Sequence, residues 1–118
     1  MELTKSEAIA NHRKMWNWIA DETLKRKRTV RKWDYFRAHE ISGLDIPRHQ
    51  CYCCEYTSNG VYLNCRNCPI VWGGEINTCM DRDNFDDDKE LYSLWCDEPD
   101  YIKSAELARR IAELPERK

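Results

Sequence analysis

The sequence predicts a mainly helical α+β fold in which a zinc-binding β-hairpin separates two helical regions. Two Cys-x-x-Cys pairs lie near the middle of the chain, and Asn-Gly, the strongest short hairpin signal, lies between them. Apolar residues recur at helical spacing on both sides. Because 118 residues suffice for one modest core, we expect a single zinc-stabilised domain over residues 1–118. Within it, we expect helices in 1–45, the zinc hairpin in 49–74 and helices in 86–114.

The N-terminal region is expected to hold a pair of helices. Thr4 and Glu7 have the spacing of a capping box, with Thr4 as the N-cap residue. The apolar stripe that follows predicts a helix running to about Lys27, with Ile9, His12, Trp16, Ile19, Ala20 and Thr23 on one side. Thr29 could cap a second, shorter helix that carries Trp33 and Phe36, reaches toward Ile41 and stops at Gly43.

The two cysteine pairs have the spacing of a tetrahedral zinc site. Each Cys-x-x-Cys turn offers two thiolates, and a hairpin between the pairs would bring the second over the first. The predicted ligands of a structural Zn²⁺ are Cys51, Cys54, Cys65 and Cys68. Four thiolates leave no open coordination position, so a catalytic zinc is not expected. Cys79 is an alternative that could replace one of the four ligands.

The remaining cysteines and the composition indicate a reducing environment. Cys53 is expected to point away from the metal, and Cys96 is expected in the core. Seven cysteines without a secretory signal favour the cytoplasm, where thiols serve metals rather than disulfides. No apolar run reaches membrane-spanning length, so we expect no membrane association.

Two helices are expected to close the chain. The first follows Asp86 or Asp87 and turns Leu91, Leu94 and Trp95 toward the core. The second begins at Asp97-Glu98-Pro99, an acidic cap with Pro in the first turn. Its predicted buried stripe is Ile102, Ala105, Ala108, Ile111 and Ala112.

Charge is unevenly distributed along the chain. Residues 1–50 carry 11 Lys and Arg against 7 Asp and Glu, whereas residues 51–118 carry 8 against 14. The basic segment Lys25–Lys32 could contact nucleic-acid phosphates, with Trp33 and Tyr35 available for stacking. The alternative is a solvated helix end whose cations complement the helix dipole. The candidate phosphate-binding residues are Lys25, Arg26, Lys27, Arg28, Arg31 and Lys32.

Catalytic constellations are not evident in the sequence. An HNH-type nuclease needs a metal-binding histidine after its hairpin, and no histidine follows His49. A redox Cys-x-x-Cys site would begin a helix in a βαβ unit, which nothing around Cys51 or Cys65 indicates. The acidic stretch 81–86 lacks the glycine of a calcium-binding loop. We therefore predict that the protein is not an enzyme.

The stretch His49–Trp95 carries a family resemblance. Its Cys-Tyr-Cys-Cys-Glu-Tyr, Asn-Cys-Arg-Asn-Cys-Pro-Ile, later Cys79 and Leu-Tyr-Ser-Leu-Trp segments resemble a group of small, mostly uncharacterised phage-encoded proteins. The resemblance implies zinc at Cys51, Cys54, Cys65 and Cys68, and it supports Cys79 as an alternative ligand. It also implies a viral or prophage origin. It implies no catalytic residues.

These observations predict a non-enzymatic, zinc-stabilised small binding protein. We expect it to act in the host cytoplasm by contact with a host or viral protein, in host modulation or anti-defence. The alternative is a nucleic-acid-binding regulator that uses Lys25–Lys32. No small-molecule substrate is evident.

Overall fold

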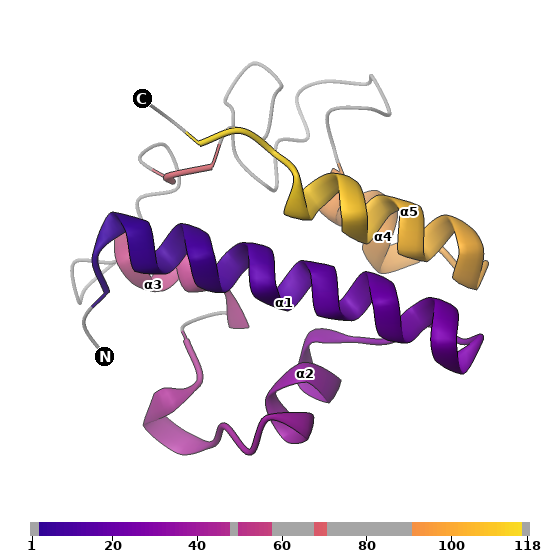
Figure 1. Ribbon diagram of the computed structural model, residues 1–118, viewed down its shortest axis with the longest axis horizontal. Coiled ribbons are helices and arrows are strands. Elements are labelled where there is room, and N and C mark those ends of the chain that lie inside the picture. The colour runs from indigo at the N-terminus through magenta and orange to yellow at the C-terminus, as the bar shows by residue number, and fades with distance from the viewer. Residues whose placement is uncertain (1–2, 48–49, 58–67, 71–90, 117–118) are drawn as a thin grey trace.

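The computed structural model describes residues 3–47, 50–57, 68–70 and 91–116. The described helices are α1 (Lys5–Arg26), α2 (Lys32–Ala38), the 3-10 helix η1 (Gly43–Asp45), α3 (Tyr52–Thr57), α4 (Leu91–Asp97) and α5 (Tyr101–Ala112). Helix α1 runs through the middle of the molecule, with α4 and α5 on one side of it and α2 on the other (Figure 1). It packs against α5, α3 and α2, and α4 packs against α5.

The predicted α+β fold class is wrong, although its mainly helical character is confirmed. The described residues contain five α-helices and no β-strand, and the one backbone bridge among them joins Ile70 to Glu116. The first cysteine pair, expected to lead into a strand, lies at the start of α3. The amide of Glu55 donates to the carbonyl of Cys51 at 3.0 Å, which closes a helical turn. The predicted Asn59-Gly60 turn and the strand after it lie outside the described residues.

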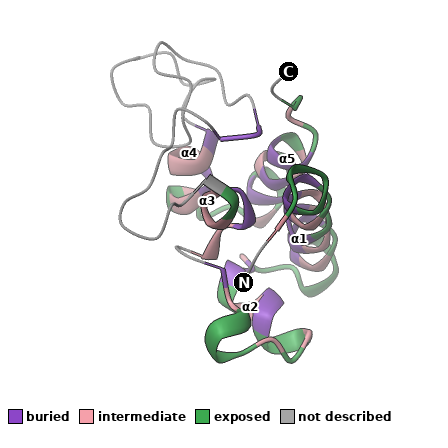
Figure 2. Cartoon of the chain, turned by 90° about the vertical axis from the view of Figure 1, so that its left-hand side faces the viewer, coloured by how far each residue is buried: buried purple, intermediate pink, exposed green. Residues whose placement is uncertain are grey.

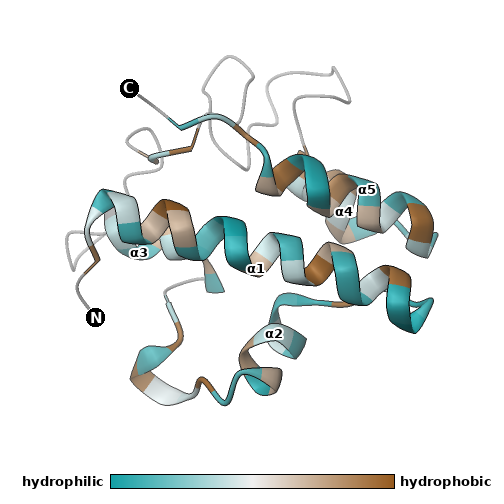
Figure 3. Cartoon of the chain, in the orientation of Figure 1, coloured by the Kyte–Doolittle hydropathy of each residue, from teal (hydrophilic) through white to brown (hydrophobic). Residues whose placement is uncertain are grey.

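Helix α1 confirms the predicted start and buried stripe. The Glu7 amide donates to Thr4 Oγ1 at 3.1 Å, and the Thr4 amide donates to Glu7 Oε1 at 2.9 Å, which completes the capping box. The helix ends where Lys27 takes the left-handed conformation, at φ 55°. Every residue of the predicted stripe is buried, and Met15 joins it. Hydrophobic residues recur among hydrophilic ones along α1 and α5, as in amphipathic helices (Figure 3).

Helix α5 lies antiparallel to α1 and starts later than predicted. Its N-cap is Asp100, whose Oδ1 accepts from the Ile102 amide at 2.9 Å, so Pro99 precedes the cap rather than occupying the first turn. The predicted stripe is buried except for Ile102, which is exposed. The small side chains of Ala105, Ala108 and Ala112 at this face allow the helix backbones to approach closely.

Aromatic residues fill the core between α1 and α4. The rings of Trp16 and Trp95 meet edge to face, with centroids 4.6 Å apart, and Tyr92 lies 6.2 Å from Trp16. Leu91 and Trp95 are buried as predicted, and Leu94 is half-buried. Each of the longer helices has a buried and an exposed side (Figure 2).

Helix α2 differs from the prediction at both ends. Its N-cap is Arg31 rather than Thr29, and the Arg31 amide donates to Asp34 Oδ2 at 2.8 Å. The helix ends at Ala38, so Ile41 lies beyond it, with its amide donating to the Phe36 carbonyl at 2.8 Å.

Candidate functional site

The described part of the chain includes three of the four predicted zinc ligands. Cys51 immediately precedes α3, Cys54 lies in the first turn of α3, and the buried Cys68 comes from a separate segment. The Cys54 amide donates to Cys51 Sγ at 3.3 Å. This bond holds the first sulfur in place, as the turn of a Cys-x-x-Cys site requires. Cys65 and the alternative ligand Cys79 lie outside the described residues.

The surroundings of Cys51 favour its thiolate. Hydrogen bonds from the Cys53 and Cys54 side chains are the main reason that the pKa of Cys51 lies well below its usual range, and the positive charge of Lys32 adds to them. The thiolate is the form of cysteine that binds zinc. The chemistry of the described donors therefore fits the predicted metal.

Cys53 differs from its predicted orientation. It is fully buried, and its thiol forms hydrogen bonds with Cys51 and Cys68, which raise its pKa. The prediction placed the Cys53 side chain on the side of the Cys-x-x-Cys turn opposite the metal. In the structure the side chains of Cys53 and Cys54 both form hydrogen bonds with Cys51, so this turn gathers three sulfurs rather than two.

The described residues do not by themselves complete a metal site. No group of three or more His, Cys, Asp or Glu side chains within residues 3–47, 50–57, 68–70 and 91–116 is arranged to hold a metal ion. The predicted set also needs Cys65 or Cys79, which lie elsewhere in the chain. Zinc binding therefore stays a prediction.

One of the six candidate phosphate-binding residues is buried, and a second is exposed but contacts an aromatic ring of the core. Lys32 is only 7% exposed, and its ammonium lies 4.3 Å from the ring centroid of Tyr92 and 5.8 Å from that of Trp16. The guanidinium of Arg31 lies 5.2 Å from the ring centroid of Trp95 and donates to the Trp95 carbonyl at 3.5 Å. These cation–π contacts explain how two cations are accommodated against apolar side chains.

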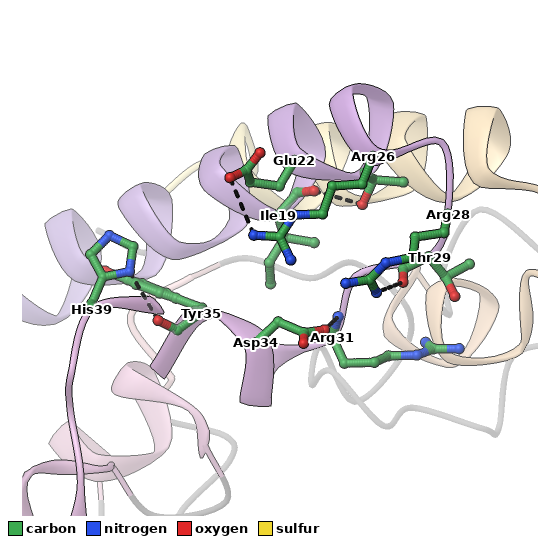
Figure 4. Close-up of polar contacts among 10 residues, drawn as sticks. Ile19, Glu22, Arg26, Arg28, Thr29, Arg31, Asp34, Tyr35 and His39 are labelled. Carbon is green, nitrogen blue, oxygen red and sulfur yellow. Dashed lines mark hydrogen bonds and ion pairs between the residues drawn. The ribbon is translucent and has the colours of Figure 1, made fainter. Parts of the chain in front are cut away.

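The other four cations of this segment are exposed. They are Lys25, Arg26, Lys27 and Arg28. Arg26 forms an ion pair with Glu22 at 3.5 Å, and Arg28 donates to the Thr29 carbonyl at 3.2 Å (Figure 4). The structure therefore leaves five of the six candidate cations exposed and buries Lys32.

The two aromatic rings proposed for base stacking are also divided. Tyr35 is buried, with its ring stacked on Trp18 at 5.5 Å and on Phe36 at the same distance. Trp33 is 49% exposed, and the Arg37 guanidinium lies 5.9 Å from its ring centroid. Of the two rings, Trp33 is the one that a ligand could reach.

A leucine on η1 is displayed almost completely to solvent, and sequence reasoning missed it. Leu44 is 93% exposed. The turn that carries it is closed by the Asp45 amide donating to the Ser42 carbonyl and by the Ile46 amide donating to the Gly43 carbonyl, both at 3.2 Å. Gly43 has φ 60°, a conformation that glycine adopts without strain. The available signal was a leucine directly after a turn glycine.

Comparison with protein-family models, curated proteins and solved structures found no match to this chain. None of the described helices combines the length and the apolar composition needed to cross a membrane.

Proposed function

We propose that this protein is a small, non-enzymatic binding protein that acts by contacting another protein. The observation that carries the proposal is the display of Leu44 and Trp33 on the edge formed by α2 and η1. Fully burying a leucine side chain contributes about 1.5–3 kcal/mol, so the exposed Leu44, together with the half-exposed Trp33, forgoes stabilisation that a partner would recover. Tryptophan and arginine are also the residues that most often dominate the energy of protein interfaces.

The backbone that presents these side chains is anchored on both sides. Ile41 and Ile46 flank η1 and pack against the core, while Tyr35 and Phe36 bury the inner side of α2. A rigid presentation reduces the conformational entropy lost on binding. We refer to residues Lys32–Asp45 as the α2–η1 edge.

We propose that a structural zinc ion stabilises the fold that holds this edge. Its ligands would be Cys51, Cys54, Cys65 and Cys68, with Cys79 as the alternative. The support is the Cys54 amide bond to Cys51 Sγ and the cluster that Cys51 forms with Cys53, which also contacts the buried Cys68. Bound zinc would add folding free energy to a chain with a mean hydropathy of −0.84.

Site-specific crosslinking tests the proposed interaction edge. A photoreactive amino acid is placed at Trp33, at Leu44 and, as a matched exposed apolar control, at Ile102 in separate variants expressed in cells. We expect one protein to crosslink strongly from positions 33 and 44 and weakly from 102. Equal crosslinking from all three positions, or none from the α2–η1 edge, would contradict the proposal.

Nucleic-acid binding is a second candidate, favoured by the four consecutive exposed cations Lys25–Arg28. This candidate function predicts a gel shift with single-stranded DNA or RNA, with an affinity that falls steeply as the salt concentration rises. Neutralising Lys25 and Lys27 should remove the shift, whereas neutralising Lys5 and Lys14 should not. No shift at low salt would eliminate this candidate.

A further inference from the structure

We propose that the protein partner docks through a segment rich in both acidic and aliphatic residues, which occupies the end of α1 and the turn into α2. This inference rests on the proposed protein-binding function and names the chemistry of the partner. We call the surface the basic corner. It consists of Leu24, Lys25, Arg26, Lys27, Arg28, Trp33 and Arg37.

Charge is the first argument for an acidic partner. Residues 22–37 carry seven Lys and Arg against two Asp and Glu, a net charge of +5. Both acids of this segment are engaged locally, Glu22 with Arg26 and Asp34 with the Arg31 amide. Lys32 is buried, whereas the other six cations are exposed, although the Arg31 guanidinium also contacts the ring of Trp95. A carboxylate-bearing partner would complement them and speed association.

Exposed apolar side chains are the second argument, and they favour a protein over a nucleic acid. Leu24 is 48% exposed directly before the four cations, and Trp33 is 49% exposed after them. A base could stack on Trp33, but a nucleic acid has few aliphatic groups with which to cover Leu24. An acidic segment that also carries Leu, Ile or Val would pair with the cations and cover the apolar side chains of Leu24 and Trp33.

The charge outside the corner is the third argument. The whole chain has a net charge of −2, so the residues outside 22–37 carry −7. A long polyanion extending past the corner would experience this repulsion, whereas a short acidic segment would contact the corner alone. The charge distribution of the protein therefore favours a short acidic ligand over a nucleic-acid strand.

Peptide selection tests the inference. A display library of random peptides is selected on the wild-type protein, and binders are then measured against two variants. Lys25→Gln/Lys27→Gln removes two charges from the basic corner, and Lys5→Gln/Lys14→Gln removes two exposed charges from the N-terminal half of α1. We expect the selected peptides to combine Asp or Glu with aliphatic residues. Binding should weaken about three- to tenfold in the corner variant and remain within about twofold in the control.

Each other outcome overturns the inference in a distinguishable way. Neutral or basic selected peptides, no selected peptides, or equal weakening in both variants would refute the acidic partner. An oligonucleotide that binds more tightly than the peptides, and loses affinity in the corner variant, would assign the corner to nucleic acid. Salt-sensitive self-association that the corner variant abolishes would assign it to a second copy of this chain. Crosslinking from Trp33 and Leu44 to a protein whose binding ignores the corner variant would leave the proposed function intact while refuting this inference.

Discussion

Helix α1 has two different flanks. On the α5 flank, small and aliphatic side chains pack together, and polar atoms find partners across the interface. His12 Nε2 lies 3.1 Å from the Ile111 carbonyl, and Arg109 bonds to both Asn17 and Asp21. Where side chains of α2, α3 and α4 pack around α1, on either side of it, the contacts are instead aromatic rings, cations over rings and a cluster of thiols. We call these the α5 flank and the aromatic–thiol flank.

The difference shows which interactions each flank depends on. The α5 flank is held by apolar burial along two helices and needs nothing beyond the chain. The aromatic–thiol flank includes a buried cation and four hydrogen-bonded cysteine side chains, groups that are stable in a core only when their charges and hydrogen bonds are matched. We therefore expect the aromatic–thiol flank to be the more sensitive to substitution.

The largest effect should follow from removing a predicted zinc ligand. Replacing Cys54 with Ser should abolish binding of one zinc equivalent and unfold α3, because structural zinc sites contribute on the order of 10 kcal/mol of apparent binding free energy. Metal analysis and hydrogen exchange of the purified variant measure both effects. Cys96→Ser is the control, since Cys96 is not a predicted ligand.

The same measurements identify the fourth ligand. Full zinc occupancy in Cys65→Ser with loss in Cys79→Ser would show that Cys79 replaces Cys65. Full occupancy in Cys54→Ser, or a wild-type protein that binds no zinc, would refute the metal site. Equal loss of protection in α5 and α3 would show that the two flanks do not respond separately.

A second comparison uses two lysines of the same basic segment. Lys32→Ala should lower the free energy of unfolding by about 1–3 kcal/mol, because it removes a buried stem and cation–π contacts with Tyr92 and Trp16. Lys25→Ala, at an exposed position, should change it by less than about 0.5 kcal/mol. Urea denaturation of both variants tests the prediction, which equal destabilisation would contradict.

These lysines also show what the sequence could and could not predict. The α5 flank was largely predictable because its buried residues recur at helical spacing in α1 and α5. The burial of Lys32 was not, since the pattern treats lysine as a surface residue. Its aromatic partners include Tyr92 of α4, which only the folded chain brings near.

Local ambiguity explains the errors in individual elements. The Cys51–Cys54 turn is compatible with either a helix or a strand, and the Asn-Gly signal after it favoured the strand. The cap of α5 was misplaced because Asp97 and Asp100 both suit an N-cap position. The candidate metal site was predicted from spacing alone, and spacing does not indicate that Cys53 lies inward against Cys51 and Cys68.

The free energy of unfolding should depend on pH through His12, which contacts α5. Burial is the main cause that lowers the pKa of His12 below its usual value. Because the Ile111 carbonyl can only accept, Nε2 carries the proton of this hydrogen bond, and the lowered pKa favours the neutral form of the ring. The unfolded chain then binds more protons than the native one, so stability is full above about pH 6.5 and falls as the pH drops below it.

Replacing His12 with Gln tests this pH dependence, because the amide can donate to the same carbonyl but does not titrate. Chemical denaturation at several pH values should show a shallower acid loss in the variant than in the wild type. Identical slopes would rule out His12 as a source of acid sensitivity.

The smallest effect is expected at Ser104, a buried polar residue on the α5 flank. Among the described residues, its hydroxyl finds no hydrogen-bond partner, although it is fully buried beside the alanines of α5. Burying a hydroxyl without a partner costs about 1–3 kcal/mol, and alanine has nearly the same volume and a higher helix propensity. Ser104→Ala should therefore leave stability unchanged or raise it by up to about 1 kcal/mol in thermal and chemical denaturation. Ala105→Ser, which adds a hydroxyl at the neighbouring buried position, should destabilise by a comparable amount. A loss of stability in Ser104→Ala would mean that the hydroxyl is hydrogen-bonded in solution, and that the α5 flank also depends on a polar contact.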